Sequence, residues 1–177
     1  MLDKENFEFI KNIDDLVKKA TLLANIFFKD KKDKGGFPYL GHLQYVSNAF
    51  DDETRKVVGL LHDIIEDTVV SKTILLELGF SEEIVDVIDI LTKKTDDYEE
   101  YIKTIEDSNN LVALDIKLKD LEHNMDIARI MNPTEEDYKR VEKYKNCYKK
   151  LQRKREENPK LKLLLEIKIL KFKIKYR

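Results

Sequence analysis

Residues 59–68, GLLHDIIEDT, place four side chains that can exchange protons or bind a metal within one apolar segment. The pairs His62/Glu66 and Asp63/Asp67 are each four residues apart, so on a helix the members of each pair share a face. Ionisable groups at the edge of an apolar surface need partners, because burying them without one costs free energy. A divalent metal is one such partner, and an exposed, salt-bridged helix face is the alternative.

Two more polar residues stand in apolar surroundings elsewhere in the chain. His42 lies in PYLGHLQYV and Asp120 lies in IKLKDLEHNM, where Asn124 follows four residues later. Taken alone, His42 would be a core histidine, whereas an aspartate on an apolar face needs a reason. Together with the His-Asp dipeptide of the first segment, these residues offer two imidazoles and two carboxylates. That mixed ligand set suits Mn, Fe, Zn, Co or Ni better than Ca.

The elements that must position these residues are predicted to be helices. The chain of 177 residues has only 5 Gly and 3 Pro and is rich in Leu, Ile, Lys and Glu, a composition that favours helices. Apolar residues recur at helical spacing in eight segments separated by Gly, Pro or capping residues. The segments are 4–30, 40–51, 55–67, 70–79, 81–93, 96–107, 109–131 and 134–158. We find no convincing run of paired strands and predict an all-α bundle of seven or eight helices.

Charge is unevenly distributed along the chain. The formal net charge is −2, yet residues 139–177 hold sixteen Lys and Arg against four Asp and Glu, and residues 1–138 hold seventeen against thirty-one. We predict a domain of residues 1–158 and a basic, apolar tail of residues 159–177. The tail pattern fits an edge element packed on its own domain or on a second copy, a segment that binds nucleic acid or a membrane surface, or a disordered end.

Composition also limits the setting of the protein. A hydrophobic fraction of 42% is enough for a core, so wholesale disorder is excluded. No apolar run approaches the ~20 residues of a membrane span, and the polar, acidic start MLDKENFEF is not a signal peptide. The single cysteine, Cys147, excludes a disulfide framework and a cysteine-rich zinc site. We therefore expect a cytoplasmic protein.

Four stretches carry a resemblance to a known family. They are GGFPYLGH (35–42), GLLHDIIEDT (59–68), LTK (91–93) and IKLKDLEHNMD (116–126). In order and spacing they resemble the HD superfamily of metal-dependent phosphohydrolases, and within it the guanosine polyphosphate hydrolases of the RelA/SpoT type. The second stretch is the most specific, because a plain HD protein need not carry the trailing Glu-Asp-Thr. The resemblance covers roughly residues 20–150 and implies an HD-domain helical bundle.

The resemblance also implies residue roles. The ligands of one divalent metal, commonly Mn with Fe, Co, Ni or Zn as alternatives, would be His42, His62, Asp63 and Asp120. The catalytic residues would be Glu66, Asp67 and Asn124, of which the two acids orient or deprotonate the attacking water. The substrate-binding residues would be Lys31, Lys32 and Lys34, for which a solvated loop of charges is the alternative, with Lys93 and Lys117 as further candidates for binding phosphate.

The chain departs from the family pattern at two positions, and two further residues, Tyr39 and His123, lie close to the predicted ligands in the sequence. Lys31 stands where the family commonly has arginine, and lysine binds phosphate without bidentate geometry or guanidinium stacking. Leu43 stands where a proline commonly follows the histidine, which alters a local turn. We expect Tyr39 to be a packing residue, with contact to a ligand as the alternative, and His123 to be an exposed or boundary residue away from the face of Asp120.

The function implied is metal-dependent removal of the 3′-pyrophosphate from guanosine tetra- or pentaphosphate-type nucleotides, without synthesis of them. The alternative is an HD-type phosphatase or phosphodiesterase acting on another nucleotide with the same metal. A third hypothesis is a nucleotide- or partner-binding module, which would have no need of Glu66 and Asp67. The expected partner is a small nucleotide; we expect no membrane or nucleic-acid partner and keep a homodimer as an option.

Overall fold

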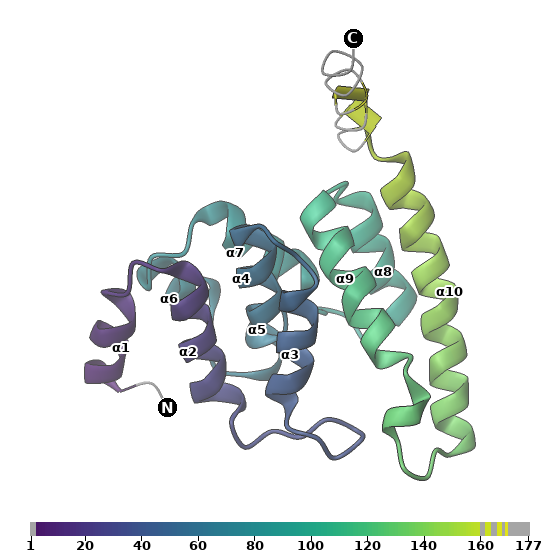
Figure 1. The fold of residues 1–177 in the computed structure, drawn as a ribbon, viewed down its shortest axis with the longest axis horizontal. Coiled ribbons are helices and arrows are strands. Elements are labelled where there is room, and N and C mark those ends of the chain that lie inside the picture. Colours follow the sequence, from purple (N-terminus) through teal and green to yellow (C-terminus); the bar gives the residue numbers. More distant parts are fainter. Residues whose placement is uncertain (1–2, 160–161, 164–165, 168, 170–177) are drawn as a thin grey trace.

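The computed structural model describes residues 3–159, 162–163, 166–167 and 169, and in this part of the chain the fold is all-α (Figure 1). These residues form ten α-helices, one 3-10 helix and a single isolated bridge between Lys32 and Pro38. The helices are α1 (Lys4–Lys11), α2 (Leu16–Phe28), α3 (Tyr39–Asn48), α4 (Glu53–Leu61), α5 (Ile64–Asp67), α6 (Lys72–Glu77), α7 (Glu82–Leu91), α8 (Tyr98–Asp107), α9 (Leu111–Asn124), η1 (Ile127–Arg129) and α10 (Glu135–Glu157). The all-α prediction is confirmed.

The described residues form more helices than the roughly seven or eight that the spacing predicts, because two predicted helices are each divided. The segment 4–30 is interrupted before Leu16, where the side chain of Asp15 accepts a hydrogen bond from the Lys18 N–H and starts α2 as an N-cap. The segment 55–67 is interrupted at His62 and Asp63, which form a turn between α4 and α5. Apolar spacing continues across both interruptions, so spacing alone does not reveal them.

The predicted helix 109–131 also ends earlier than expected. Helix α9 stops at Asn124, and the side chain of Asp126 then accepts from the Ala128 N–H and caps the short helix η1. The connection to α10 is closed by Thr134, whose hydroxyl and whose N–H form a capping box with Asp137. This irregular connection matters because it lies beside the candidate site.

Helix α4 lies at the centre of the bundle and packs against α2, α3, α7 and α9. Its residue Gly59 permits a close approach to α3, because a Cβ there would lie 2.8 Å from both the Cα and the N of Ser47. The approach places His62, directly after α4, beside His42 of α3, with 5.3 Å between the ring centroids. A backbone contact therefore sets the separation of these two imidazoles.

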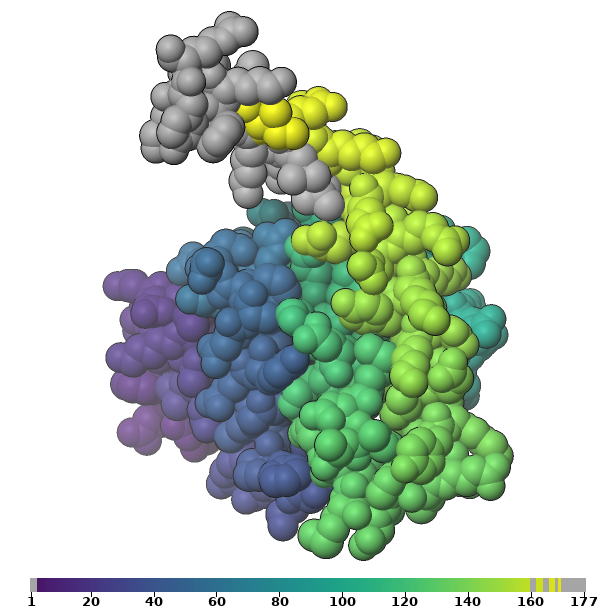
Figure 2. Space-filling view, turned by 45° about the vertical axis from the view of Figure 1, so that its right-hand side comes forward, coloured from purple at the N-terminus to yellow at the C-terminus, as the bar shows by residue number. Residues whose placement is uncertain are grey.

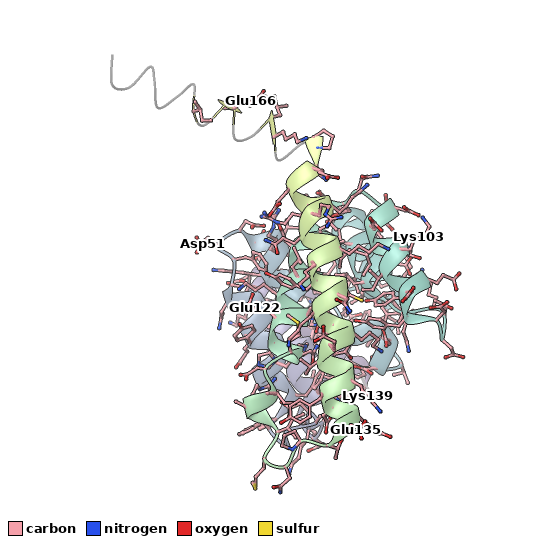
Figure 3. The ribbon with its side chains drawn as sticks, turned by 90° about the vertical axis from the view of Figure 1, so that its right-hand side faces the viewer. Asp51, Lys103, Glu122, Glu135, Lys139 and Glu166 are labelled. Atoms are coloured by element: carbon pink, nitrogen blue, oxygen red, sulfur yellow. The ribbon has the colours of Figure 1, made fainter. Side chains whose placement is uncertain are left out.

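Helix α10 runs along α8 and α9 on one side of the bundle, and Glu135 and Lys139 mark its first turns in Figure 3. Buried Asp115 of α9 holds α10 in place. The carboxylate of Asp115 accepts hydrogen bonds from Arg155 of α10 and from Arg55 of α4. Among the residues described, no helix combines the length and the apolar character needed to cross a membrane. The basic tail predicted for residues 159–177 lies mostly outside the described residues.

Candidate active site

Helix α3, helix α9 and the turn between α4 and α5 bring the four predicted metal ligands together. Nε2 of His42 lies 3.3 Å from Oδ1 of Asp120 and 3.8 Å from Oδ2 of Asp63. Nε2 of His62 lies 3.0 Å from Oδ2 of Asp63 and 3.9 Å from Oδ1 of Asp120. One ligand atom from each of His42, His62 and Asp63 falls within 4.8 Å of the others, a spacing that can hold a metal ion. We call these four residues the metal cluster.

The state of His62 tests whether the cluster fits a metal. Its Nδ1 lies 2.9 Å from the carbonyl oxygen of Gly59, which only accepts, so Nδ1 carries a proton. Its Nε2 is buried and, among the described residues, has no hydrogen-bond partner of suitable geometry although carboxylate oxygens of Asp63 and Asp120 face it. Burial lowers the pKa of His62, but these carboxylates raise it to about 10, so the position attracts a positive charge. A divalent cation shared by the imidazole and the carboxylates fits this arrangement.

Neighbouring side chains orient the two carboxylates of the cluster. Asp120 accepts from the ammonium of Lys117 at 2.7 Å and from the side-chain amide of Asn124. Asp63 accepts from the hydroxyl of Tyr39. Burial raises the pKa of Asp120, but Lys117 and the nearby imidazoles bring it well below its usual range, so the carboxylate stays ionised and able to bind a cation.

The predicted acid/base residues lie on α5 and are held by different segments. Oε2 of Glu66 accepts from the backbone N–H of Lys93 at 2.8 Å. Burial raises the pKa of Glu66, the Lys93 N–H opposes this rise, and the pKa stays above its ordinary value. The carboxylate of Asp67 pairs instead with the ammonium of Lys31. Glu66 is thus the better placed base, because its carboxylate is held by a neutral N–H, whereas that of Asp67 is engaged by an ammonium.

A cavity of about 230 Å³ opens next to the metal cluster, and we call it the basic cavity. Its lining residues are Lys31, Lys32, Asp33, Lys34, Gly35, Tyr39, His123, Asn124, Asp126, Arg129, Ile130, Arg140 and Tyr144. Tyr39 and Asn124 belong to both regions, since each also bonds a carboxylate of the cluster. Figure 2 shows the loop before α3 and the connection between α9 and α10 next to each other at the lower end of the molecule.

The predicted substrate lysines divide between two environments. Lys31, Lys32 and Lys34 line the basic cavity. Lys117 does not line the cavity. It is buried, and its ammonium donates to Asp120, so Lys117 orients a carboxylate of the metal cluster. Lys93 also lies outside the lining, and its backbone N–H holds Glu66.

Sequence reasoning missed Arg129, Arg140 and Tyr144, which line the cavity from the region after α9. The spacing of Arg140 and Tyr144 was a usable signal, because residues four apart on α10 share a face. Arg129 gave no such signal, since its position depends on the irregular connection around η1.

His123 is half-buried, as expected of a boundary residue, but the expectation that it lies away from the face of Asp120 is wrong. Nδ1 of His123 lies 2.8 Å from Nδ1 of His42, and its ring centroid lies 4.9 Å from that of His42 and 4.4 Å from that of Tyr45. His123 follows Asp120 by three residues, a helical spacing that brings it to the same side of α9. Tyr39 packs on Phe28 and in addition donates to Asp63, so it is more than a packing residue.

Comparisons with known proteins agree with this fold. No protein-family model matches the chain. A GTP pyrophosphokinase of Myxococcus xanthus is 37% identical over 83 residues, which is 45% of this chain but only 11% of that protein's length. The solved structure of a metazoan ortholog of SpoT, described as hydrolysing ppGpp and playing a role in starvation responses, has a TM-score of 0.65 and 22% identity, covering 81% of this chain and 86% of that chain. The chain therefore has the fold of a SpoT-type hydrolase.

Proposed function

We propose that this protein, with its SpoT-type fold, is a metal-dependent pyrophosphohydrolase that removes the 3′-pyrophosphate from guanosine tetra- or pentaphosphate-type nucleotides. The observation that carries the proposal is that the metal cluster adjoins the basic cavity through Tyr39 and Asn124, with Glu66 on the helix that begins directly after Asp63. A metal-dependent hydrolase needs the metal cluster and a base such as Glu66, and a highly phosphorylated substrate needs the basic cavity. The choice of substrate is supported by the metazoan structure of the same fold, which is described as a ppGpp hydrolase.

The metal cluster would hold one divalent ion, and we propose Mn. The ligands would be His42, His62, Asp63 and Asp120, whose two imidazoles and two carboxylates suit a transition metal. When bound, the ion supplies an activated water and a Lewis acid for a phosphoryl oxygen. Asn124 holds Asp120 and also lines the basic cavity, so it can hold the substrate beside the ligands.

Glu66 acts as the general base in this proposal. Its carboxylate is fixed by the Lys93 N–H, and its raised pKa suits it to accept the proton of the attacking water. A positioned general base contributes ~10²–10⁴-fold to the rate. Asp67 helps to orient the water and, through its ion pair, holds Lys31 at the mouth of the cavity.

The basic cavity binds the phosphates and the base. Its five lysine and arginine residues outnumber its two aspartates, so it favours an anion. The cationic residues are Lys31, Lys32, Lys34, Arg129 and Arg140. Arg140 can bind a phosphate with two parallel hydrogen bonds, which a lysine cannot do. Tyr144 offers an aromatic face on which a nucleobase can stack.

A panel of nucleotides tests the proposal. Purified protein is incubated with Mn²⁺ and guanosine tetraphosphate, its adenosine counterpart, cyclic nucleotides or nucleoside monophosphates. We expect release of pyrophosphate from guanosine tetraphosphate. Orthophosphate release or ring opening of a cyclic nucleotide in its place would indicate an HD phosphatase or phosphodiesterase. Saturable binding without turnover would indicate a binding module.

We also propose a cytoplasmic setting, in line with the single cysteine Cys147, and a division into a hydrolase domain of residues 1–158 and a basic tail of residues 159–177. A homodimer remains an option for this domain. Measurement of the molar mass in solution decides between monomer and dimer.

A further inference from the structure

A continuous series of side-chain contacts joins a predicted metal ligand to the loop that carries the cavity lysines. Nδ1 of His42 lies 2.8 Å from Nδ1 of His123. The same Nδ1 of His123 lies 2.6 Å from NH1 of Arg129. The guanidinium of Arg129 also donates to the carboxylate of Asp33, in the loop between α2 and α3.

The chemistry of these groups allows one arrangement of protons. A guanidinium only donates hydrogen bonds, so Nδ1 of His123 must be the accepting, unprotonated nitrogen of its ring. The proton between the two imidazoles therefore belongs to Nδ1 of His42. The remaining lone pair of His42 is then on Nε2, the atom that lies 3.3 Å from the carboxylate of Asp120. This is the tautomer that metal ligation at Nε2 requires.

Packing holds the two imidazoles in register. The ring of His123 contacts both His42 and Tyr45, with centroid separations of 4.9 and 4.4 Å. The loop between α2 and α3 lies directly against η1, because a Cβ at Gly35 would overlap the carbonyl oxygen of Arg129. The position of Arg129 is therefore set by the loop, and the position of His123 by Arg129 and the neighbouring rings.

The other imidazole of the cluster is oriented differently. His62 donates from Nδ1 to a backbone carbonyl, that of Gly59, within its own segment. Metal-binding histidines usually donate their second N–H to a carboxylate, a backbone carbonyl or water. His42 has a neutral imidazole in that position, and this acceptor depends in turn on a loop of the basic cavity.

We propose that His123 is a positioning residue that fixes the metal-binding tautomer and the orientation of His42, and that Arg129 and Asp33 tie this function to the loop of Lys31 to Lys34. The inference rests on the proposed function, since it assumes that the cluster binds a metal. Loss of such an outer partner typically lowers metal affinity 10–100-fold.

Two variants of His123 separate hydrogen bonding from packing. His123→Phe keeps an aromatic ring against His42 and Tyr45 but has no acceptor. His123→Asn loses the ring but places a carbonyl oxygen close to the position of Nδ1. Calorimetric titration of the full chain with Mn²⁺ should show affinity about 10–100-fold weaker for His123→Phe and a clear recovery for His123→Asn.

The possible results are distinct. An unchanged affinity in His123→Phe would overturn the inference, as would equal losses in both variants with the helical circular dichroism signal retained. If wild-type protein fails to bind Mn²⁺ at all, the proposed function itself fails. If wild-type protein binds Mn²⁺ and hydrolyses guanosine tetraphosphate while His123→Phe matches it, only the positioning role fails.

Arg129→Met tests the second part and keeps the measurement informative should His123→Phe not fold. It removes the donor that forces the tautomer without altering either ring. We expect a smaller loss of Mn²⁺ affinity and, in long-range ¹H–¹⁵N spectra of the metal-free protein, mixed protonation of Nδ1 in His123. Retention of wild-type affinity and of a single unprotonated Nδ1 would overturn the role of Arg129.

Discussion

The metal cluster and the basic cavity adjoin each other but are built from different parts of the molecule. In the cluster, His42, His62 and Asp120 are buried, with 3%, 2% and 5% of their surface exposed, and they sit on or next to helices packed into the core. The cavity is lined by exposed or half-buried side chains from the loop before α3, the connection around η1 and the first half of α10. Tyr39 and Asn124 join the two regions.

This difference in burial indicates that the cluster and the cavity have separate roles. Groups in the cluster are held by core packing and by buried hydrogen bonds, so their geometry changes little unless the bundle itself changes. Groups in the cavity are held by surface loops and ion pairs, which tolerate substitution more readily. Reaction chemistry should therefore depend on the first region and substrate choice on the second, and variants in each region should affect different measured quantities.

The largest effect should come from breaking the cluster. Asp63→Ala removes a carboxylate that lies 3.0 Å from Nε2 of His62, and we expect loss of Mn²⁺ binding and of hydrolysis to the background of the assay. Calorimetry and pyrophosphate release measure the two losses. Lys32→Ala, a substitution in the cavity, is the control and should retain Mn²⁺ binding. Full activity of Asp63→Ala would disprove the proposed ligand set.

Glu66→Gln should separate metal binding from proton transfer. We expect unchanged Mn²⁺ affinity and a kcat ~10²–10⁴-fold lower, because the amide cannot accept the proton of the water. The wild-type rate should fall as the pH is lowered through the pKa of Glu66, and burial raises this pKa above its ordinary value of 4.5. The acid limb of the pH–rate profile should therefore lie above pH 4.5. Survival of activity in Glu66→Gln would show that another group takes the proton.

A substitution in the cavity should alter affinity for the nucleotide and leave the cluster intact. Arg140→Ala removes a guanidinium, and hydrogen bonds to charged groups contribute ~1.5–3 kcal/mol, so we expect KM to rise by about 10–100-fold. Mn²⁺ affinity should not change. Arg140→Lys is the matched variant, since it keeps the charge and loses the paired donors. Equal KM values for Arg140→Lys and wild type would indicate that charge alone matters.

Gly59→Ala should act on the scaffold under the cluster. Its Cβ would lie 2.8 Å from the backbone of Ser47, so α3 and α4 must separate. Overpacking of this kind costs ~1–3 kcal/mol in the free energy of unfolding, which urea denaturation measures. Gly41→Ala is the control, because a Cβ at Gly41 contacts nothing within 4 Å. Equal stability of the two variants would show that the helices separate without cost.

The sequence predicted the cluster better than the cavity, and the reason lies in the physics of each. Ionisable residues such as Asp120 are conspicuous on an apolar helix face, because burial demands a partner. The turn at His62 and Asp63 was missed because the apolar spacing continues through it. Arg129 and Arg140 were missed because their contribution depends on how distant segments meet, and a charged residue at a surface gives no periodic signal.

The ion pair of Asp115 with Arg155 fixes the C-terminal half of α10, whereas the basic cavity lies near its N-terminal end. Arg155 lies fifteen residues after Arg140 on α10, which is about 22 Å at 1.5 Å per residue. Because α10 is continuous over this length, we expect a tilt allowed by loss of the Asp115 ion pairs to displace Arg140 and Tyr144 near its other end. Loss of the Asp115 carboxylate should therefore weaken the proposed binding of a nucleotide in the cavity, although Asp115 does not line that cavity.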